Sequence, residues 1–294
     1  MPVLNICKFV AMNLGEARTY TVKRLTTVIE EGEAQAMGKE LVLHVAGIDN
    51  KDWTYHQNKS LQEEKIILLN QLLLRIEQGE PLQYVTGEAW FFGLRLTVTP
   101  AVLIPRPETE ELVDWVISHC QFPIEQLELL EIGTGSGCIA LALQKRLRKA
   151  TVTAIEYSQE ALAVAEMNAK QLGIHPRFMR GDLLKEDQWK TWPNFSFLIS
   201  NPPYIPLTEI NSMEKRVTDH EPALALFVSD EDPLCFYRSL GKLLLAKGLP
   251  DAQLFCEVHA RLALETENML KEMGLKTEIK LDMQGKERMI RAWR

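Results

Sequence analysis

From residue 127 onward, short apolar runs alternate with amphipathic runs, a pattern that leaves few folds open. The apolar runs have the length of strands, whereas an amphipathic run such as 159–172 carries helix-capping residues, Ser158 before it and Gly173 after it. Such alternation predicts an α/β fold, a Rossmann-like doubly wound parallel sheet with helices on both faces. Strands are expected at 127–132, 150–156, 177–180, 195–200 and 252–258, and helices at 137–148, 159–172, 232–246 and 260–273.

The two ends of the chain have different patterns. In Lys65–Gly79 the apolar residues recur at helical spacing, and no strand pattern interrupts the region before residue 85. The aromatic and β-branched run 90–98 predicts a β-hairpin or extended connector, and 276–281 with 288–293 predicts an antiparallel terminal hairpin. We expect three parts: a small all-α bundle at 1–84, a connecting β-hairpin at 85–105, and an α/β domain at 106–294.

A glycine-rich loop, Glu131-Ile132-Gly133-Thr134-Gly135-Ser136-Gly137, follows the first expected strand of the alternation. Glycines at such a turn let the backbone approach a ligand closely. The pattern departs from the dinucleotide fingerprint because Cys138 stands at its last position. Glu131 suits a cationic ligand such as S-adenosylmethionine, which carries a sulfonium and an ammonium group but no phosphate. At the next two strand ends, Glu156 is expected to accept the ribose hydroxyls and Asp182 the adenine amino group.

The stretch Ser200-Asn201-Pro202-Pro203-Tyr204-Ile205-Pro206 ends another expected strand. Ligands of doubly wound sheets bind beyond the carboxyl ends of the strands, so Asn201 should lie beside the cofactor pocket. The Asn201 side-chain oxygen and the Pro202 carbonyl could accept both N–H groups of a planar NH2 group. These bonds would strengthen as positive charge develops on that nitrogen. We expect Tyr204 to stack on the target, and Pro202 and Pro203 to fix the geometry.

Composition argues against several classes of protein. The net charge of −7 opposes non-specific binding to DNA or to anionic membranes. The six histidines show no zinc-binding spacing, so no metal is expected, and neither a signal peptide nor an apolar run of about 18 residues is evident. We expect a cytoplasmic protein without a membrane or a direct nucleic-acid partner. The five cysteines are scattered and lack a C-x-x-C pair: Cys7, Cys120, Cys138, Cys235 and Cys256.

The loop at 131–137 together with Asn201–Tyr204 resembles class I methyltransferases that act on planar nitrogens. Two subgroups share these features, the DNA adenine-N6 methyltransferases and the HemK/PrmC family. The latter methylates the glutamine of the Gly-Gly-Gln motif in peptide chain release factors. Pro81–Gly87, Phe92–Leu94 and Val102–Glu110 are similar to the HemK/PrmC signature and are not features of DNA methyltransferases.

This resemblance implies a release factor N5-glutamine methyltransferase that tunes translation termination, with class 1 release factors as partners. The helical domain would recognise the substrate, and 106–294 would be the methyltransferase domain. Departures include Glu156 in place of an aspartate and Glu257-Val258-His259 in place of an E-I-G-x-x-Q run. Asn201, Pro202 and Tyr204 would be catalytic, and Asn201, Pro202, Pro203 and Tyr204 would bind the target. The implied residues for S-adenosylmethionine are Glu131, Gly133, Thr134, Gly135, Ser136, Gly137, Glu156, Asp182, Leu183 and Asn201.

Several alternatives stay open or are disfavoured. A DNA adenine-N6 methyltransferase would need a basic DNA-binding surface, against which the net charge argues. A cofactor-binding scaffold would be plausible only without Asn201, and an NAD-linked dehydrogenase is disfavoured by Cys138. Glu221-Pro222 indicates either a lid over the substrate or a surface loop. The charged residues Arg106, Glu108 and Glu110 either form a cluster at a helix start or line the cofactor mouth.

Overall fold

The computed structural model describes residues 12–120 and 127–294. The chain divides into two compact units, Met1–Gly87 and Glu88–Arg294. Cys7 and the first eleven residues of the helical segment expected at 1–84 lie outside the described residues. Within the described residues, each unit has its own hydrophobic core.

The first unit is helical, as its sequence predicts. The apolar residues that recur at helical spacing in Lys65–Gly79 are at most 4% exposed and form part of the core of this unit: Ile66, Leu69, Leu73 and Ile76. The helix at 31–46 ends at Gly47, whose left-handed backbone (φ 71°) closes the last turn. The helices are α1 (Leu14–Leu25), α2 (Glu31–Ala46), α3 (Trp53–His56), α4 (Glu63–Glu77) and α5 (Leu82–Thr86), with the 3-10 turn η1 (Asn50–Asp52) before α3.

The expected hairpin is present and packs with the second unit. Strands β1 (Glu88–Phe91) and β2 (Leu94–Thr97) pair in antiparallel register. Phe92 and Gly93 between them have φ values of 50° and 71°, which suit a two-residue turn that matches the twist of the strands. Phe91 and Leu94 are buried in the core of the second unit, so the hairpin serves as part of that core.

A seven-stranded sheet forms the centre of the second unit, in the order β10-β11-β9-β6-β3-β4-β5. The five strands from β9 to β5 run parallel, whereas β11 pairs antiparallel with both β9 and β10. The Rossmann-like sheet and its antiparallel C-terminal hairpin are therefore confirmed. The strands are β3 (Glu128–Ile132), β4 (Thr151–Glu156), β5 (Arg177–Arg180), β6 (Phe195–Ser200), β9 (Gly248–Glu257), β10 (Lys276–Leu281) and β11 (Glu287–Trp293).

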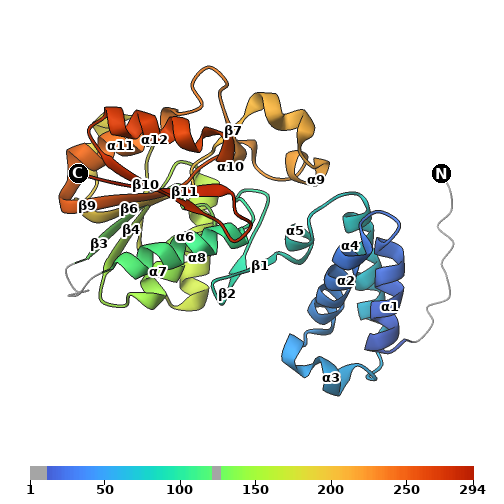
Figure 1. The fold of residues 1–294 in the computed structure, drawn as a ribbon. Coiled ribbons are helices and arrows are strands. Elements are labelled where there is room, and N and C mark those ends of the chain that lie inside the picture. Colours follow the sequence, from blue (N-terminus) through green and yellow to red (C-terminus); the bar gives the residue numbers. More distant parts are fainter. Residues whose placement is uncertain (1–11, 121–126) are drawn as a thin grey trace. The chain divides into compact units, whose positions relative to one another are not determined.

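Helices cover both faces of this sheet (Figure 1). One hydrophobic cluster contains residues of α6, α7 and the β1–β2 hairpin, and a second contains residues of α11 and α12. The chain leaves β3 in one direction through β4 and β5 and in the other through β6 and β9, so the strand order reverses between β3 and β6. The covering helices are α6 (Pro107–His119), α7 (Cys138–Arg146), α8 (Gln159–Leu172), α11 (Cys235–Lys247) and α12 (Ala263–Glu272).

Element boundaries differ from the sequence expectation at several ends. The strand expected from 252 begins at Gly248, and the helix expected at 260–273 divides into the 3-10 turn η5 (Ala260–Leu262) and α12. The helix expected from 232 begins at Cys235, and the one expected to 148 ends at Arg146. Helix and strand ends depend on local capping and on tertiary contacts, which periodicity does not reveal.

The segment from 205 to 228 contains structure that the sequence did not predict. Its two-residue strands β7 (Ile205–Pro206) and β8 (Phe227–Val228) pair in parallel. The chain between them forms η4 (Leu207–Ser212), α9 (Lys215–Thr218) and α10 (Ala223–Leu226).

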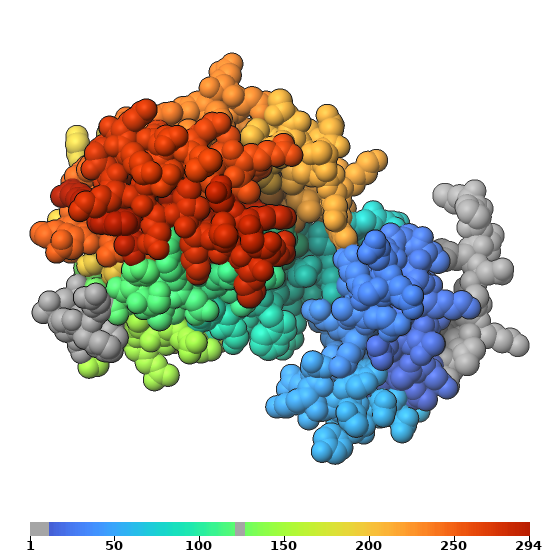
Figure 2. All heavy atoms as spheres, viewed as in Figure 1, coloured from blue at the N-terminus to red at the C-terminus, as the bar shows by residue number. Residues whose placement is uncertain are grey.

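The C-terminal hairpin lies against α6. In Figure 2 the red C-terminal segment meets the green surface of α6 and α7, and the backbone N–H of Met283 donates to Glu111 Oε1 of α6 at 3.2 Å. Asp282 accepts hydrogen bonds from the backbone N–H groups of Gln284 and Lys286, both at 2.9 Å, which holds the turn closed. The C-terminal hairpin is thus fixed to α6.

Candidate functional site

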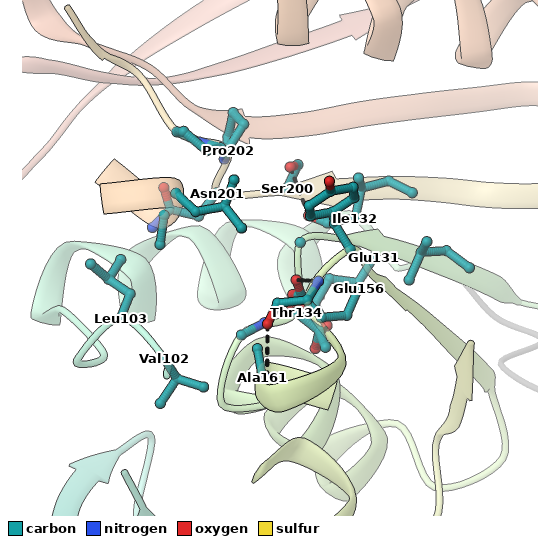
Figure 3. Close-up of a pocket in the computed structure, with 18 of the residues that line it drawn as sticks. Val102, Leu103, Glu131, Ile132, Thr134, Glu156, Ala161, Ser200, Asn201 and Pro202 are labelled. Atoms are coloured by element: carbon teal, nitrogen blue, oxygen red, sulfur yellow. Dashed lines mark hydrogen bonds between the residues drawn. The ribbon is translucent and has the colours of Figure 1, made fainter. Parts of the chain in front are cut away.

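A pocket of about 540 Å³ lies at the carboxyl ends of β3, β4 and β6, next to the point where the strand order reverses. Figure 3 shows Glu131, Thr134 and Glu156 gathered beneath Asn201 and Pro202. In open α/β sheets, ligands bind at this position. Eleven of the sequence-predicted site residues line the pocket: Glu131, Gly133, Thr134, Gly135, Ser136, Glu156, Asp182, Leu183, Asn201, Pro202 and Pro203.

The glycine loop forms the floor of this pocket. Gly135 has a φ of 55°, a left-handed conformation that other residues adopt only with strain. Gly137 does not line the pocket but precedes α7, where a Cβ would lie 3.2 Å from the Ala165 side chain. Gly137 is therefore required for the close packing of the loop against α8. Gly135 allows the left-handed turn that brings the loop backbone to the pocket.

Glu156 holds the loop in place. It is 8% exposed, and its Oε2 accepts from the Gly135 N–H at 2.8 Å. Its Oε1 accepts from the Ser158 N–H at 2.9 Å. A carboxylate has about four lone-pair positions, so both oxygens can still accept hydroxyl donors from a ligand.

Glu131 is buried beside the pocket with one oxygen unsatisfied. The Thr134 hydroxyl donates to Oε2 at 2.7 Å, whereas Oε1 has no hydrogen-bond partner. Burial raises the pKa of Glu131 to about 8, and the Thr134 hydroxyl and the backbone N–H of Ala140 only partly oppose that rise. A buried carboxyl group with a free acceptor oxygen fits a cationic ligand group, because a nearby positive charge would favour its ionised form. The acceptor oxygens of Glu131 and Glu156 therefore fit the cationic and hydroxyl groups of S-adenosylmethionine.

The end of β5 contributes the third predicted contact region. Asp182 Oδ1 accepts from the Leu184 N–H at 3.0 Å, which leaves Oδ2 beside Lys185 at 3.7 Å. Leu183 is 5% exposed and lines the pocket as an apolar wall. The pocket also contains Cys138, but burial raises the pKa of its thiol to about 12, so it is not a thiolate nucleophile.

Asn201 is held by a residue of another element. Its Nδ2 donates to the Thr109 Oγ1 of α6 at 3.1 Å, and the two residues are 92 positions apart in the sequence. The neighbouring Ser200 hydroxyl donates to the Ile132 carbonyl at 2.8 Å, which fixes the end of β6 to the end of β3. With Nδ2 engaged, Asn201 has its oxygen available for a ligand N–H.

Tyr204 does not line the pocket. Its ring packs with the cluster of α11 and α12, edge-on to His259 with ring centroids 6.1 Å apart. Burial raises the pKa of its hydroxyl to about 12. The sequence expectation that this ring stacks on the target stays a prediction.

Two charged elements left open by the sequence meet at the pocket. Arg106 lines it and forms an ion pair with Glu221, whose side chain is 2% exposed and whose Oε2 also accepts from the Ile104 N–H at 3.2 Å. Pro222 lines the pocket as well. Glu110 instead accepts from the Phe92 N–H at 2.7 Å and ties α6 to the hairpin. Glu221 itself does not line the pocket, but it is buried next to Arg106 and Pro222, which do, so it does not belong to an exposed loop.

Sequence reasoning missed a set of apolar wall residues and the Thr109 contact. The wall residues carry no polar signal, so only the fold could place them. In the sequence Thr109 was noted only as part of the run Val102–Glu110, and no local pattern linked it to Asn201. The missed wall residues include Val102, Leu103, Tyr157, Leu224, Ala225 and Phe236.

Among residues 12–120 and 127–294, no group of three or more His, Cys, Asp or Glu side chains is placed to hold a metal ion. None of the helices in those ranges is long and apolar enough to cross a membrane.

Each of the two units matches a known protein family. The Methyltransferase small domain family matches residues 114–218, and the PrmC N-terminal domain family matches residues 16–87. The chain is 35% identical over 277 residues to a Release factor glutamine methyltransferase of Flavobacterium psychrophilum, covering 93% of this chain and 96% of the relative. It is 36% identical to the protein of the same description from Bacteroides thetaiotaomicron, covering 93% and 97%.

Solved structures with low sequence identity share the fold. The hMettl16 catalytic domain, solved in complex with an RNA hairpin, is 15% identical with a TM-score of 0.53 and covers 86% of this chain and 90% of that one. A methyltransferase from Pyrococcus furiosus is 18% identical with a TM-score of 0.51, covering 69% and 89%. At these identities, the likeness supports a methyltransferase fold and nothing finer.

Proposed function

We propose a function that follows from the family of this chain. The chain belongs to the release factor glutamine methyltransferase family, because it is similar to relatives of that description over nearly its whole length. It is an S-adenosylmethionine-dependent methyltransferase. We propose that it methylates the side-chain amide nitrogen, N5, of the glutamine in the Gly-Gly-Gln motif of class 1 release factors. The observation that supports this proposal most is that the glycine loop and Asn201-Pro202-Pro203 line the same pocket.

Binding of the cofactor is assigned to the glycine loop and the acidic strand ends. Glu131, with its unsatisfied Oε1, would face the cationic groups, and Glu156 would accept the ribose hydroxyls. Asp182 and Leu183 would hold the adenine. When bound, S-adenosylmethionine supplies an electrophilic methyl group on a sulfonium sulfur.

The chemistry of the amide is assigned to Asn201 and Pro202. A carboxamide nitrogen is a poor nucleophile because its lone pair is delocalised into the carbonyl. Asn201 Oδ1 and the Pro202 carbonyl would each accept one of its N–H groups. Hydrogen bonds to a group that gains charge are about twice as strong as neutral ones, so both acceptors stabilise the transition state more than the ground state. The proton can leave to water after transfer, so no dedicated base is required.

The division of labour along the chain follows the same family. We propose residues 1–84 as the substrate-recognition domain, 85–105 as the connector and 106–294 as the methyltransferase domain. The matched N-terminal family at 16–87 and the compact unit that ends at Gly87 support a separate first domain. A cytoplasmic location would follow from a release factor substrate. The relatives do not favour the DNA adenine-N6 alternative.

The test is direct transfer of labelled methyl groups. The full-length protein is incubated with labelled S-adenosylmethionine and a purified class 1 release factor, and mass spectrometry locates the methyl group. The matched control is the same release factor with its Gly-Gly-Gln glutamine replaced by glutamate, and a duplex containing adenine is run in parallel. We expect label on the glutamine alone. Label on DNA, or on the control release factor to the same extent, would refute the proposed substrate.

A further inference from the structure

Behind Asn201 lies a pair of buried polar residues that the family signature in the sequence did not assign. Thr109, 2% exposed at the start of α6, accepts from Asn201 Nδ2 at 3.1 Å. Its hydroxyl also favours the charged form of the carboxyl group of Glu257, the last residue of β9, and so acts to lower the pKa of that group. Glu257 is 1% exposed, and its Oε1 has no hydrogen-bond partner. α6 therefore supplies the partner of the Asn201 amide, and the end of β9 supplies the buried carboxyl group that Thr109 influences.

We propose that Thr109 and Glu257 are positioning residues that set which end of the Asn201 amide faces the substrate. Thr109 lines the pocket and contacts Asn201, whereas Glu257 does not line it, so both act through Asn201. The catalytic consequence rests on the proposed function, whereas the orientation of Asn201 does not.

The number of available protons decides the orientation of the Asn201 amide. A hydroxyl group has one proton to donate, and an ionised carboxylate can only accept. If Thr109 donates to Glu257, the lone pairs of its oxygen can only accept, so the Asn201 atom beside it must be Nδ2. The opposite orientation of Asn201 would bring two acceptors, Oδ1 and Oγ1, together. It would also turn an NH2 group toward the substrate amide, whose N–H groups would then lack an acceptor.

Ionisation of Glu257 controls this arrangement. Once neutral, its carboxyl group can donate to Thr109, and Thr109 can then donate to Asn201 Oδ1, which permits the unproductive orientation. Burial raises the pKa of Glu257 to about 7, and Thr109 and Arg288 oppose the rise. The arrangement is therefore locked above this pH and relaxed below it.

Other titratable groups face Glu257 from every element packed around it. Arg288 of β11, itself 3.5 Å from Asp282, favours the charged form, as does Arg106, and Glu108 opposes it. Neutral groups with raised pKa values complete the surroundings: Tyr204, Tyr237, Cys138 and Cys256. Burial keeps all four neutral around pH 7, so none of the four adds a change of charge beside Glu257 at that pH.

The first measurement requires no activity. In the full-length protein, NMR of the Asn201 side-chain amide, assigned through its loss in Asn201→Ala, should show one slowly exchanging proton. Thr109→Val, which has nearly the same shape but no hydroxyl, should lose this protection, and Thr109→Ser should keep it. Thr266→Val is the matched control, because Thr266 is a buried threonine of α12 whose hydroxyl has no partner. Unchanged exchange in Thr109→Val would overturn the proposal.

The second measurement separates positioning from folding. At saturating cofactor, Thr109→Val should lower single-turnover methylation by about 10- to 100-fold, less than direct loss of a transition-state contact. The KM for the release factor and the Kd for the cofactor should stay within about twofold, a split that a merely structural defect would not produce. Thr109→Ser should recover most of the rate, and Thr266→Val should keep it. A wild-type rate in Thr109→Val would contradict the positioning role.

The third measurement is the pH profile. The wild-type single-turnover rate should rise as pH increases through about 7, and Glu257→Gln should lack this rise because it has no ionisable group there. A rise retained in Glu257→Gln would overturn the role of its charge. If the wild-type protein failed to methylate release factors at all, the proposed function would fall, and the amide-exchange measurement would still decide the orientation of Asn201.

Discussion

Glu131 should release a proton when the cofactor binds. Its carboxyl group is 1% exposed and has a pKa of about 8, so about nine-tenths of the unliganded molecules carry the proton at pH 7. An opposite charge within about 4–6 Å lowers a carboxyl pKa by about 1–3 units. A drop of about two units would leave about one-tenth protonated, so binding at pH 7 should release about 0.8 proton.

Calorimetry measures this number directly. Titrations at pH 7 in phosphate and in Tris, whose ionisation enthalpies differ, give the protons released from the change in observed heat between buffers. Affinity should rise by up to about tenfold per pH unit between about 6 and 8 and level off above 8, because the unliganded carboxyl is then already ionised. Thr134, whose hydroxyl donates to Glu131 at 2.7 Å, is not mutated in any of these titrations.

Glu131→Gln is the control variant, since it preserves the shape and removes the titration. It should bind more weakly, release no proton and show no rise in affinity between pH 6 and 8. Equal heats in both buffers for the wild-type protein would refute the reasoning. So would the same buffer dependence in Glu131→Gln, because another group would then supply the proton.

Three further outcomes are expected. Asn201→Ala should lower single-turnover methylation by about 10²–10³ while the calorimetric affinity for the cofactor is kept, and near-normal turnover would exclude its catalytic role. Gly181→Ala should lower the free energy of unfolding in urea by about 1–3 kcal/mol, since the added Cβ would lie 2.8 Å from the Trp192 ring; an unchanged midpoint would contradict the close packing. Arg106→Ala should lower the free energy of unfolding by about 1–3 kcal/mol, because it leaves the buried Glu221 without its cation. The loss should be smaller than for a fully buried pair, because the Arg106 side chain is one-third exposed. Arg106→Lys should recover part of this loss, and equal stability of both variants would argue against the ion pair.

Much of the fold could be predicted because its signals are local. A strand or helix is encoded in consecutive residues, so the alternation after residue 127 predicted the parallel sheet, and the runs around Gly285 predicted the terminal hairpin. The glycine loop and Asn201 could also be found from the sequence, because each follows a strand and carries its own polar pattern. The rule that strand ends share one edge of a sheet then brought them into one predicted pocket.

The tertiary structure alone decided the contacts that orient these groups. Thr109 meets Asn201 across 92 residues, and Arg106 meets Glu221 across 115. Neither pair has a periodicity or spacing that a sequence reveals, because a hydrogen bond between distant segments depends on how helices and strands pack and not on neighbouring residues. The same holds for the insertion of β11 between β9 and β10 and for the burial that raises the pKa of Glu131 and Glu257. The sequence by itself determined that the glycine loop, Glu156 and Asn201 reach the site. Packing determined the apolar wall and the orientation and charge of the polar groups, since solvent exclusion and directional bonds exist only in the folded chain.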